Sequence, residues 1–117
     1  MIWWEDFKVG DSVEMGRHSF SAQEIVDFGR RFDPQPFHVD AAAAETGFFG
    51  GLIASGWHTC SVAMRVMVES YLKHAASLGS PGIDELRWLR PAELSRLRTT
   101  EGLAEIVAAA FARMEAS

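Results

Sequence analysis

The sequence predicts an α+β domain built around one buried helix, and two patterns support this prediction. Within residues 13–20 the apolar Val13 and Met15 alternate with polar residues, as in a half-buried strand. Residues 57–77 are instead apolar on most sides of a helix. A helix with so little polar surface is enclosed by the rest of its domain, so this helix is expected at the centre of the fold.

Composition narrows the class of protein. The 117 residues are 48% hydrophobic and 23% charged, which suits one soluble globular domain with a modest core. The formal net charge of −5, without a basic run, argues against nucleic acid and anionic membranes as partners. No stretch approaches the roughly 18–20 apolar residues of a membrane span. The lone Cys60 and the lack of a signal-like N-terminus indicate a reducing compartment, and we expect the cytoplasm.

The first helix is predicted by a capping box. Ser21 can accept a hydrogen bond from the amide three residues later, while Glu24 reaches back to the Ser21 N–H. The helix should end near Phe32, because Asp33 precedes a proline and such residues avoid the helical region. Its core-facing side chains are expected to be Ile25, Val26, Phe28 and Phe32.

Three further elements are expected before residue 92. Asp40 is the predicted N-cap of a short helix that Gly47 terminates. Gly56 opens the central helix, which should run from about residue 57 to residue 77. A second strand is predicted over residues 83–91.

Two titratable residues lie close together in the sequence. Asp33 and His38 are separated by Pro34 and Pro36, and the prolines predict a stiff, extended loop between them. The helix that starts at Gly56 offers free backbone N–H groups and a partial positive charge at its N-terminus. An acid, a base and an anion-stabilising helix end are the groups needed to add or remove water beside a carbonyl.

Two motifs in this region resemble those of a known family. Asp-Pro-Gln-Pro-Phe-His at 33–38, followed by Gly-Leu-Ile-Ala-Ser-Gly-Trp-His-Thr at 51–59, is similar to the MaoC-like dehydratases, which include the R-specific enoyl-CoA hydratases. The resemblance covers residues 2 to about 91 and implies the hot-dog fold, in which a curved antiparallel sheet wraps one long helix. Gln35 stands where the family's usual Asp-x-Asn-Pro-x-His motif has asparagine.

The resemblance also implies a reaction. It is the reversible hydration of a trans-2-enoyl thioester of coenzyme A or a carrier protein to the (R)-3-hydroxyacyl thioester, with neither a metal nor a redox cofactor. His38 would act as base toward the water and Asp33 would pass a proton to C2, while the Gly56 N–H would receive the enolate oxygen. Ser55 and Gln35 are assigned with Gly56 to the oxyanion and substrate-binding set. Pairing is implied as well, as a homodimer or with another hot-dog subunit.

Two alternatives remain open. A hot-dog acyl-CoA thioesterase would use a carboxylate and a helix end, but does not need the acid and base together. A non-catalytic acyl-CoA-binding or partner subunit would bind an enoyl-CoA without turning it over. Among the other histidines, His18 is expected as an ordinary residue at a strand edge and His58 as a packing residue.

Residues 92–117 depart from the family pattern, so the domain is expected at 1–91 with a divergent helical tail after it. The tail has the spacing of an amphipathic helix in Leu103, Ile106, Val107, Ala110, Phe111 and Met114. We interpret the tail as read in a shifted frame from the gene of a longer hot-dog enzyme. The sheet would then be incomplete, and the enzymatic activity of the chain would be weak or absent. The nucleotide sequence tests this interpretation.

Overall fold

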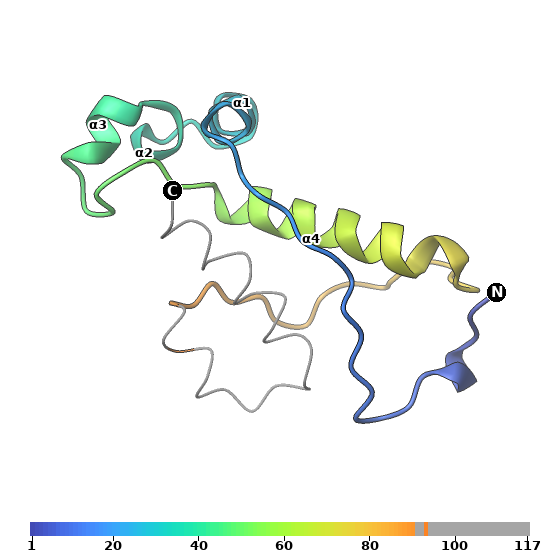
Figure 1. Ribbon diagram of the computed structural model, residues 1–117. Coiled ribbons are helices and arrows are strands. Elements are labelled where there is room, and N and C mark those ends of the chain that lie inside the picture. The colour runs from blue at the N-terminus through green and yellow to red at the C-terminus, as the bar shows by residue number, and fades with distance from the viewer. Residues whose placement is uncertain (91–92, 94–117) are drawn as a thin grey trace.

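The computed structural model describes residues 1–90 and Glu93. Along this part of the chain the elements are η1 (Trp4–Asp6), α1 (Ala22–Phe32), α2 (Pro36–Val39), α3 (Ala41–Glu45), α4 (Gly56–Ser70) and η2 (Leu72–His74). Figure 1 shows α1, α2 and α3 gathered at the end where α4 begins, whereas the N-terminus and η1 lie at its other end. The predicted acid and base therefore lie at the N-terminal end of α4. Apart from Glu93, the predicted tail lies outside the described residues.

Helix α1 has the predicted start and end. The Ser21 hydroxyl accepts from the Glu24 amide at 3.1 Å, and the Glu24 carboxylate accepts from the Ser21 amide at 3.4 Å. At the other end the Asp33 N–H donates to the Gly29 carbonyl, as the C-cap. Ile25 is buried as expected, but Phe32 is 62% exposed, so its predicted core position is wrong. It packs on Phe28 at the surface, with ring centroids 5.0 Å apart.

The proline-braced segment is extended over a shorter stretch than predicted. Gln35 has an extended backbone, but Pro36 begins α2, and His38 lies in this short helix rather than in a loop. Proline favours this outcome because its fixed φ suits the first helical position, where no N–H is needed. Helix α3 follows as predicted: the Asp40 carboxylate accepts from the Ala43 amide at 3.0 Å.

Helix α4 begins at Gly56 as predicted, but it ends at Ser70 instead of continuing to residue 77. Tyr71, with φ −141°, leaves the helical region, and η2 follows. The chain then bridges Ile2 to Ala75 in parallel. In this bridge the Ile2 N–H donates to the His74 carbonyl at 2.7 Å, and the Ala76 N–H donates to the Ile2 carbonyl at 2.8 Å. The bridge takes up the backbone groups that a longer helix would have used.

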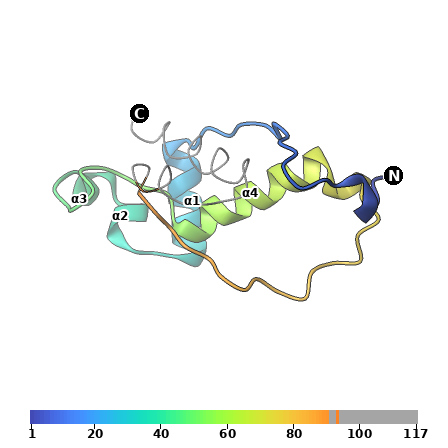
Figure 2. The same cartoon turned by 90° about the horizontal axis from the view of Figure 1, so that it is seen from below.

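The two predicted strands are not formed in the described part of the chain. Residues 13–20 and 83–90 run as irregular segments on opposite sides of α4 (Figure 2). An extended segment becomes a strand only when a neighbour pairs with its backbone, and the Ile2–Ala75 bridge is the only strand-type pairing among residues 1–90. The curved sheet expected from the resemblance is therefore not visible in the described residues.

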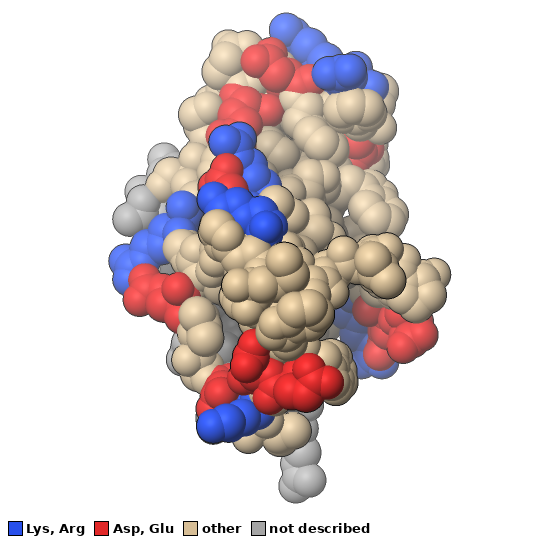
Figure 3. Space-filling view, turned by 90° about the vertical axis from the view of Figure 1, so that its right-hand side faces the viewer, with Lys and Arg blue, Asp and Glu red and all other residues tan. Residues whose placement is uncertain are grey.

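Helix α4 is also less enclosed than predicted. Within the described structure Trp57 is 59% exposed, Met64 49% and Val68 39%, whereas His58 is buried. On the face that includes the C-terminal end of α4, lysine, arginine and acidic side chains are interspersed around an uncharged central area (Figure 3). No helix among the described residues is long and apolar enough to cross a membrane.

Candidate active site

Asp33 is the centre of a hydrogen-bonded group that joins three parts of the chain. Its Oδ1 accepts from the Gln35 amide nitrogen at 2.8 Å, and its Oδ2 accepts from the Ser55 hydroxyl at 2.7 Å. His38 Nε2 lies 3.2 Å from the same Oδ2. The structure thus brings together four of the residues singled out in the sequence, and Asp33 links α1 to the start of α4.

His38 is held in one orientation. Its Nδ1 lies 2.7 Å from the Ile53 carbonyl oxygen, which can only accept, so Nδ1 carries a proton. Its Nε2 faces the Asp33 carboxylate, which also accepts. Both ring nitrogens thus face oxygen acceptors, which fix the orientation of the imidazole. The sequence did not indicate the role of Ile53, because a backbone carbonyl has no sequence signature.

The base is buried more deeply than the acid. His38 is 4% exposed, whereas the Asp33 side chain is 21% exposed. Close packing of α2 on α1 explains the difference: a Cβ placed on Gly29 would lie 3.0 Å from the Cβ and the carbonyl oxygen of His38. A glycine at this point of α1 therefore lets α2 approach and covers the imidazole.

The carboxylate of Asp33 is stabilised in its ionised form. Hydrogen bonds from Gln35 and then Ser55 hold the pKa of Asp33 below its ordinary value, although partial burial acts in the opposite direction. The His38 charge and hydrogen bond lower this pKa further. Donors to the charged form favour that form, so Asp33 is a proton acceptor in the resting protein.

The start of α4 lies beside this group. Ser55 is its N-cap residue, but no side chain caps the helix, because the Ser55 hydroxyl is engaged with Asp33. An uncapped first turn keeps its orphan N–H groups available to an anionic oxygen. Gly56, however, is closely covered: a Cβ there would overlap the indole of Trp88. The sequence pattern did not predict this contact.

A second titratable cluster lies between α1 and α4. Glu24 Oε1 is 2.7 Å from His18 Nε2 and 3.3 Å from His58 Nε2. The His58 ring stacks on Phe28, with centroids 4.6 Å apart and an interplanar angle of 5°. His58 is therefore a packing residue as expected. Glu24 was expected in a capping box, but nothing in the sequence indicated that its carboxylate also contacts two histidines.

His58 should make the fold sensitive to acid. Burial lowers the pKa of His58 from 6.5, although the Glu24 carboxylate opposes this, and its Nδ1 is buried without a partner. Below about pH 6.5 the unfolded chain binds a proton that the folded one rejects, so the free energy of unfolding should fall as the pH falls. Urea unfolding at pH 7.5 and 5.5 should show a smaller loss for His58→Phe than for the wild type. The same change at the exposed His74 should leave the loss unaltered, and an unaltered loss in His58→Phe would contradict the assignment.

The geometry is that of a site for proton transfer beside a carbonyl group. A buried imidazole and an ionised carboxylate in contact, beside an uncapped helix N-terminus, can move protons next to a carbonyl group whose oxygen becomes negative. No three metal-binding side chains gather in the described part of the chain in a way that could hold a metal ion.

Comparison with known proteins assigns the family. The profile of the MaoC like domain matches residues 6–94, and the chain belongs to this family. The crystal structure of a MaoC-like dehydratase from Rhodospirillum rubrum is 49% identical in sequence, with a TM-score of 0.58 over 62% of this chain and 49% of that one. The uncharacterized protein YdeM of Bacillus subtilis (strain 168) is 26% identical over 87 residues, 74% of this chain and 62% of that protein.

The comparisons bear on the fold as well. The likeness to the MaoC-like dehydratase supports the hot-dog assignment for the matched part, although residues 1–90 do not form the sheet. This chain spans about half the length of that dehydratase and about three fifths of YdeM.

Proposed function

We propose that this chain catalyses the reversible dehydration of an (R)-3-hydroxyacyl thioester of coenzyme A or a carrier protein to the trans-2-enoyl thioester. The observation that carries the proposal is the 3.2 Å contact between His38 Nε2 and Asp33 Oδ2 beside the N-terminus of α4. Membership of the MaoC-like family and the likeness to a MaoC-like dehydratase support the reaction class.

Each residue has a defined task in this reaction. In dehydration, the Asp33 carboxylate takes the proton from C2, and the electron pair of that bond forms an enolate whose oxygen faces the first-turn amides of α4, beginning with Gly56. His38 donates its Nε2 proton to the hydroxyl at C3, and the C3–O bond breaks to release water. In hydration, His38 takes a proton from the adding water and Asp33 returns one to C2.

The ionised state of Asp33 suits the dehydration direction. The pKa of Asp33 is lowered by its hydrogen bonds, first from Gln35 and then from Ser55, so the carboxylate carries no proton and can accept one from C2. His38 Nε2 lies against the same carboxylate, where it can donate toward the leaving hydroxyl. Hydration requires a protonated Asp33 at the start.

Gln35 and Ser55 are assigned here as positioning residues. They were expected in the substrate-binding set, but their side chains donate to Asp33. They fix the direction of the carboxylate and keep it ionised. Gln35 thus provides an amide donor at the place where the family motif has asparagine.

The test uses both directions of the reaction. Crotonyl-CoA should lose its enoyl absorbance without releasing free thiol, and (R)-3-hydroxybutyryl-CoA should gain that absorbance. Release of free thiol would favour the thioesterase instead. Binding of crotonyl-CoA without any turnover would favour the non-catalytic subunit, and either result would overturn the proposal.

A further inference from the structure

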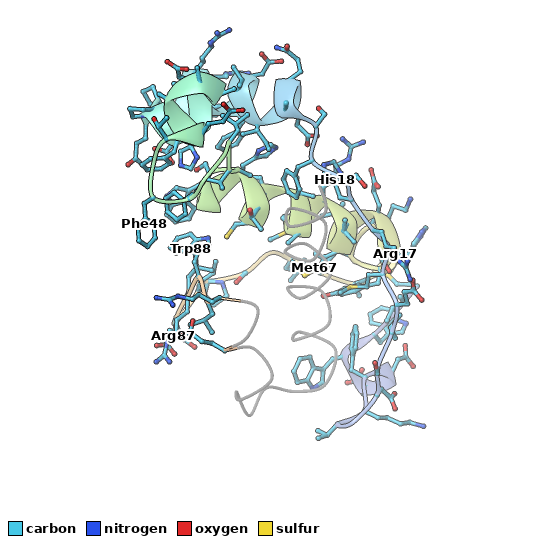
Figure 4. The ribbon with its side chains drawn as sticks, turned by 60° about the vertical axis from the view of Figure 1, so that its left-hand side comes forward. Arg17, His18, Phe48, Met67, Arg87 and Trp88 are labelled. Carbon is cyan, nitrogen blue, oxygen red and sulfur yellow. The ribbon has the colours of Figure 1, made fainter. Side chains whose placement is uncertain are left out.

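Gly29 is buried on the side of α1 that packs against α2. A Cβ at this position would lie 3.0 Å from the Cβ of His38, from its carbonyl oxygen and from Cγ1 of Val39. Carbon atoms in contact are ordinarily about 3.5–4.0 Å apart, so any side chain here must push α2 and α1 apart. Figure 4 shows α2 lying on α1, with His18 in the chain before this pair and Phe48 in the chain after α3.

The backbone of Gly29 also holds the acid of the site. The Asp33 N–H donates to the Gly29 carbonyl oxygen at 2.8 Å and so ends α1. Gly29 therefore contacts Asp33 through its backbone and His38 through its lack of a side chain. The 3.2 Å contact between His38 Nε2 and Asp33 Oδ2 depends on how closely α2 lies on α1 at this residue.

His38 is also held by the segment before α4. The Ile53 N–H donates to the Phe37 carbonyl oxygen at 3.0 Å, and the Ile53 carbonyl oxygen lies 2.7 Å from His38 Nδ1. A displacement of α2 must change these two hydrogen bonds as well as the contact between His38 and Asp33. The hydrogen bond at His38 Nδ1 therefore reports on the position of α2.

We propose that Gly29 is a positioning residue for proton transfer, because the absence of a side chain there sets the place of His38 relative to Asp33. The proposal rests on the function proposed above. Glycine weakens the interior of a helix relative to alanine, so its use in the middle of α1 is accounted for by this close approach. Gly29 acts through α2, and a misplaced base slows the chemical step, so its effect should appear in kcat rather than in KM.

The first arm of the test needs no ligand. In proton–nitrogen NMR spectra, the His38 Nδ1–H signal is the one that His38→Gln lacks. Gly29→Val should make exchange of this proton with water at least about tenfold faster, and Gly29→Ala should give a smaller increase. Arg30→Val is the matched control, since it puts the same side chain at the exposed neighbouring position of α1, and it should leave the exchange unchanged.

Backbone amides in the middle of α4 separate a local displacement from general unfolding, and they should exchange as in the wild type. Unaltered exchange at His38 in a folded Gly29→Val, or equal acceleration in α4, would overturn the proposal. If Gly29→Val does not fold, Gly29→Ala decides in the same way.

The second arm measures hydration of crotonyl-CoA. Gly29→Val should lower kcat at least about 30-fold and Gly29→Ala about threefold, with KM within about twofold of the wild type. Arg30→Val should match the wild type in both constants. A normal kcat in Gly29→Val, or a loss confined to KM, would overturn the positioning role alone. Absence of turnover in the wild type would instead contradict the proposed function, and proton exchange would still decide whether Gly29 sets the place of His38.

Discussion

Asp33→Asn should lower kcat for hydration of crotonyl-CoA by at least about 100-fold. Asparagine has nearly the same shape and can still accept the hydrogen bond from Ser55, but it cannot take or return a proton at C2. The loss should therefore appear in kcat rather than in folding, and steady-state kinetics with a circular-dichroism spectrum will show both.

Asp40→Asn is the matched control for this variant. Asp40 caps α3 by accepting from the Ala43 amide, and asparagine is as good an N-cap as aspartate. Its kcat should remain within about twofold of the wild type. Turnover by Asp33→Asn at the level of Asp40→Asn would exclude Asp33 as the proton carrier. His38→Ala is a poorer test, because it leaves the Ile53 carbonyl without its donor and a buried space behind.

Gly56→Val should destabilise the fold by roughly 1–3 kcal/mol, because the new side chain and the Trp88 indole cannot occupy the same space. This destabilisation is a direct cost in packing. Urea unfolding measures it, and Gly51→Val is the control, since a Cβ on Gly51 meets no atom within 4 Å.

Combining Gly56→Val with Trp88→Ala separates the two reasons for a glycine at this position. If the glycine only makes room for the indole, the double variant should recover most of the lost stability and also its turnover. If the Gly56 amide also receives the enolate oxygen, stability should return while kcat stays low, and this is the result we expect. Equal destabilisation with and without the indole would show that Trp88 is not the obstacle.

Short-range patterns predicted the helices well. The capping box at Ser21 and Glu24 gave the start of α1, and Asp40 gave the start of α3, because each depends on residues within one turn. The predicted strands failed because alternation describes one segment, whereas a strand also needs a partner in the right place. The C-terminal end of α4 was misplaced for a similar reason, since Ile2 pairs beside Ala75 from the opposite end of the described chain.

The residues of the site could be predicted from the sequence, but the packing around them could not. The proline-braced segment predicted that Asp33 and His38 act together, and the structure places His38 Nε2 3.2 Å from Asp33 Oδ2. Burial of His38 depends on how Gly29 lets α2 approach α1, which spacing along the chain does not reveal. Trp88 contacts Gly56 across a long stretch of sequence, so only the fold could show that contact.

The bridge between Ile2 and Ala75 has a consequence for the order of folding. It joins residues far apart in the sequence with only two backbone hydrogen bonds. The entropy lost on closing this long loop is therefore offset by few contacts. Contacts of this kind form slowly, whereas those from Ser21 to Thr59 are more local. We expect the helices that carry Asp33 and His38 to assemble first, and the two ends of this loop to join afterwards at the far end of α4.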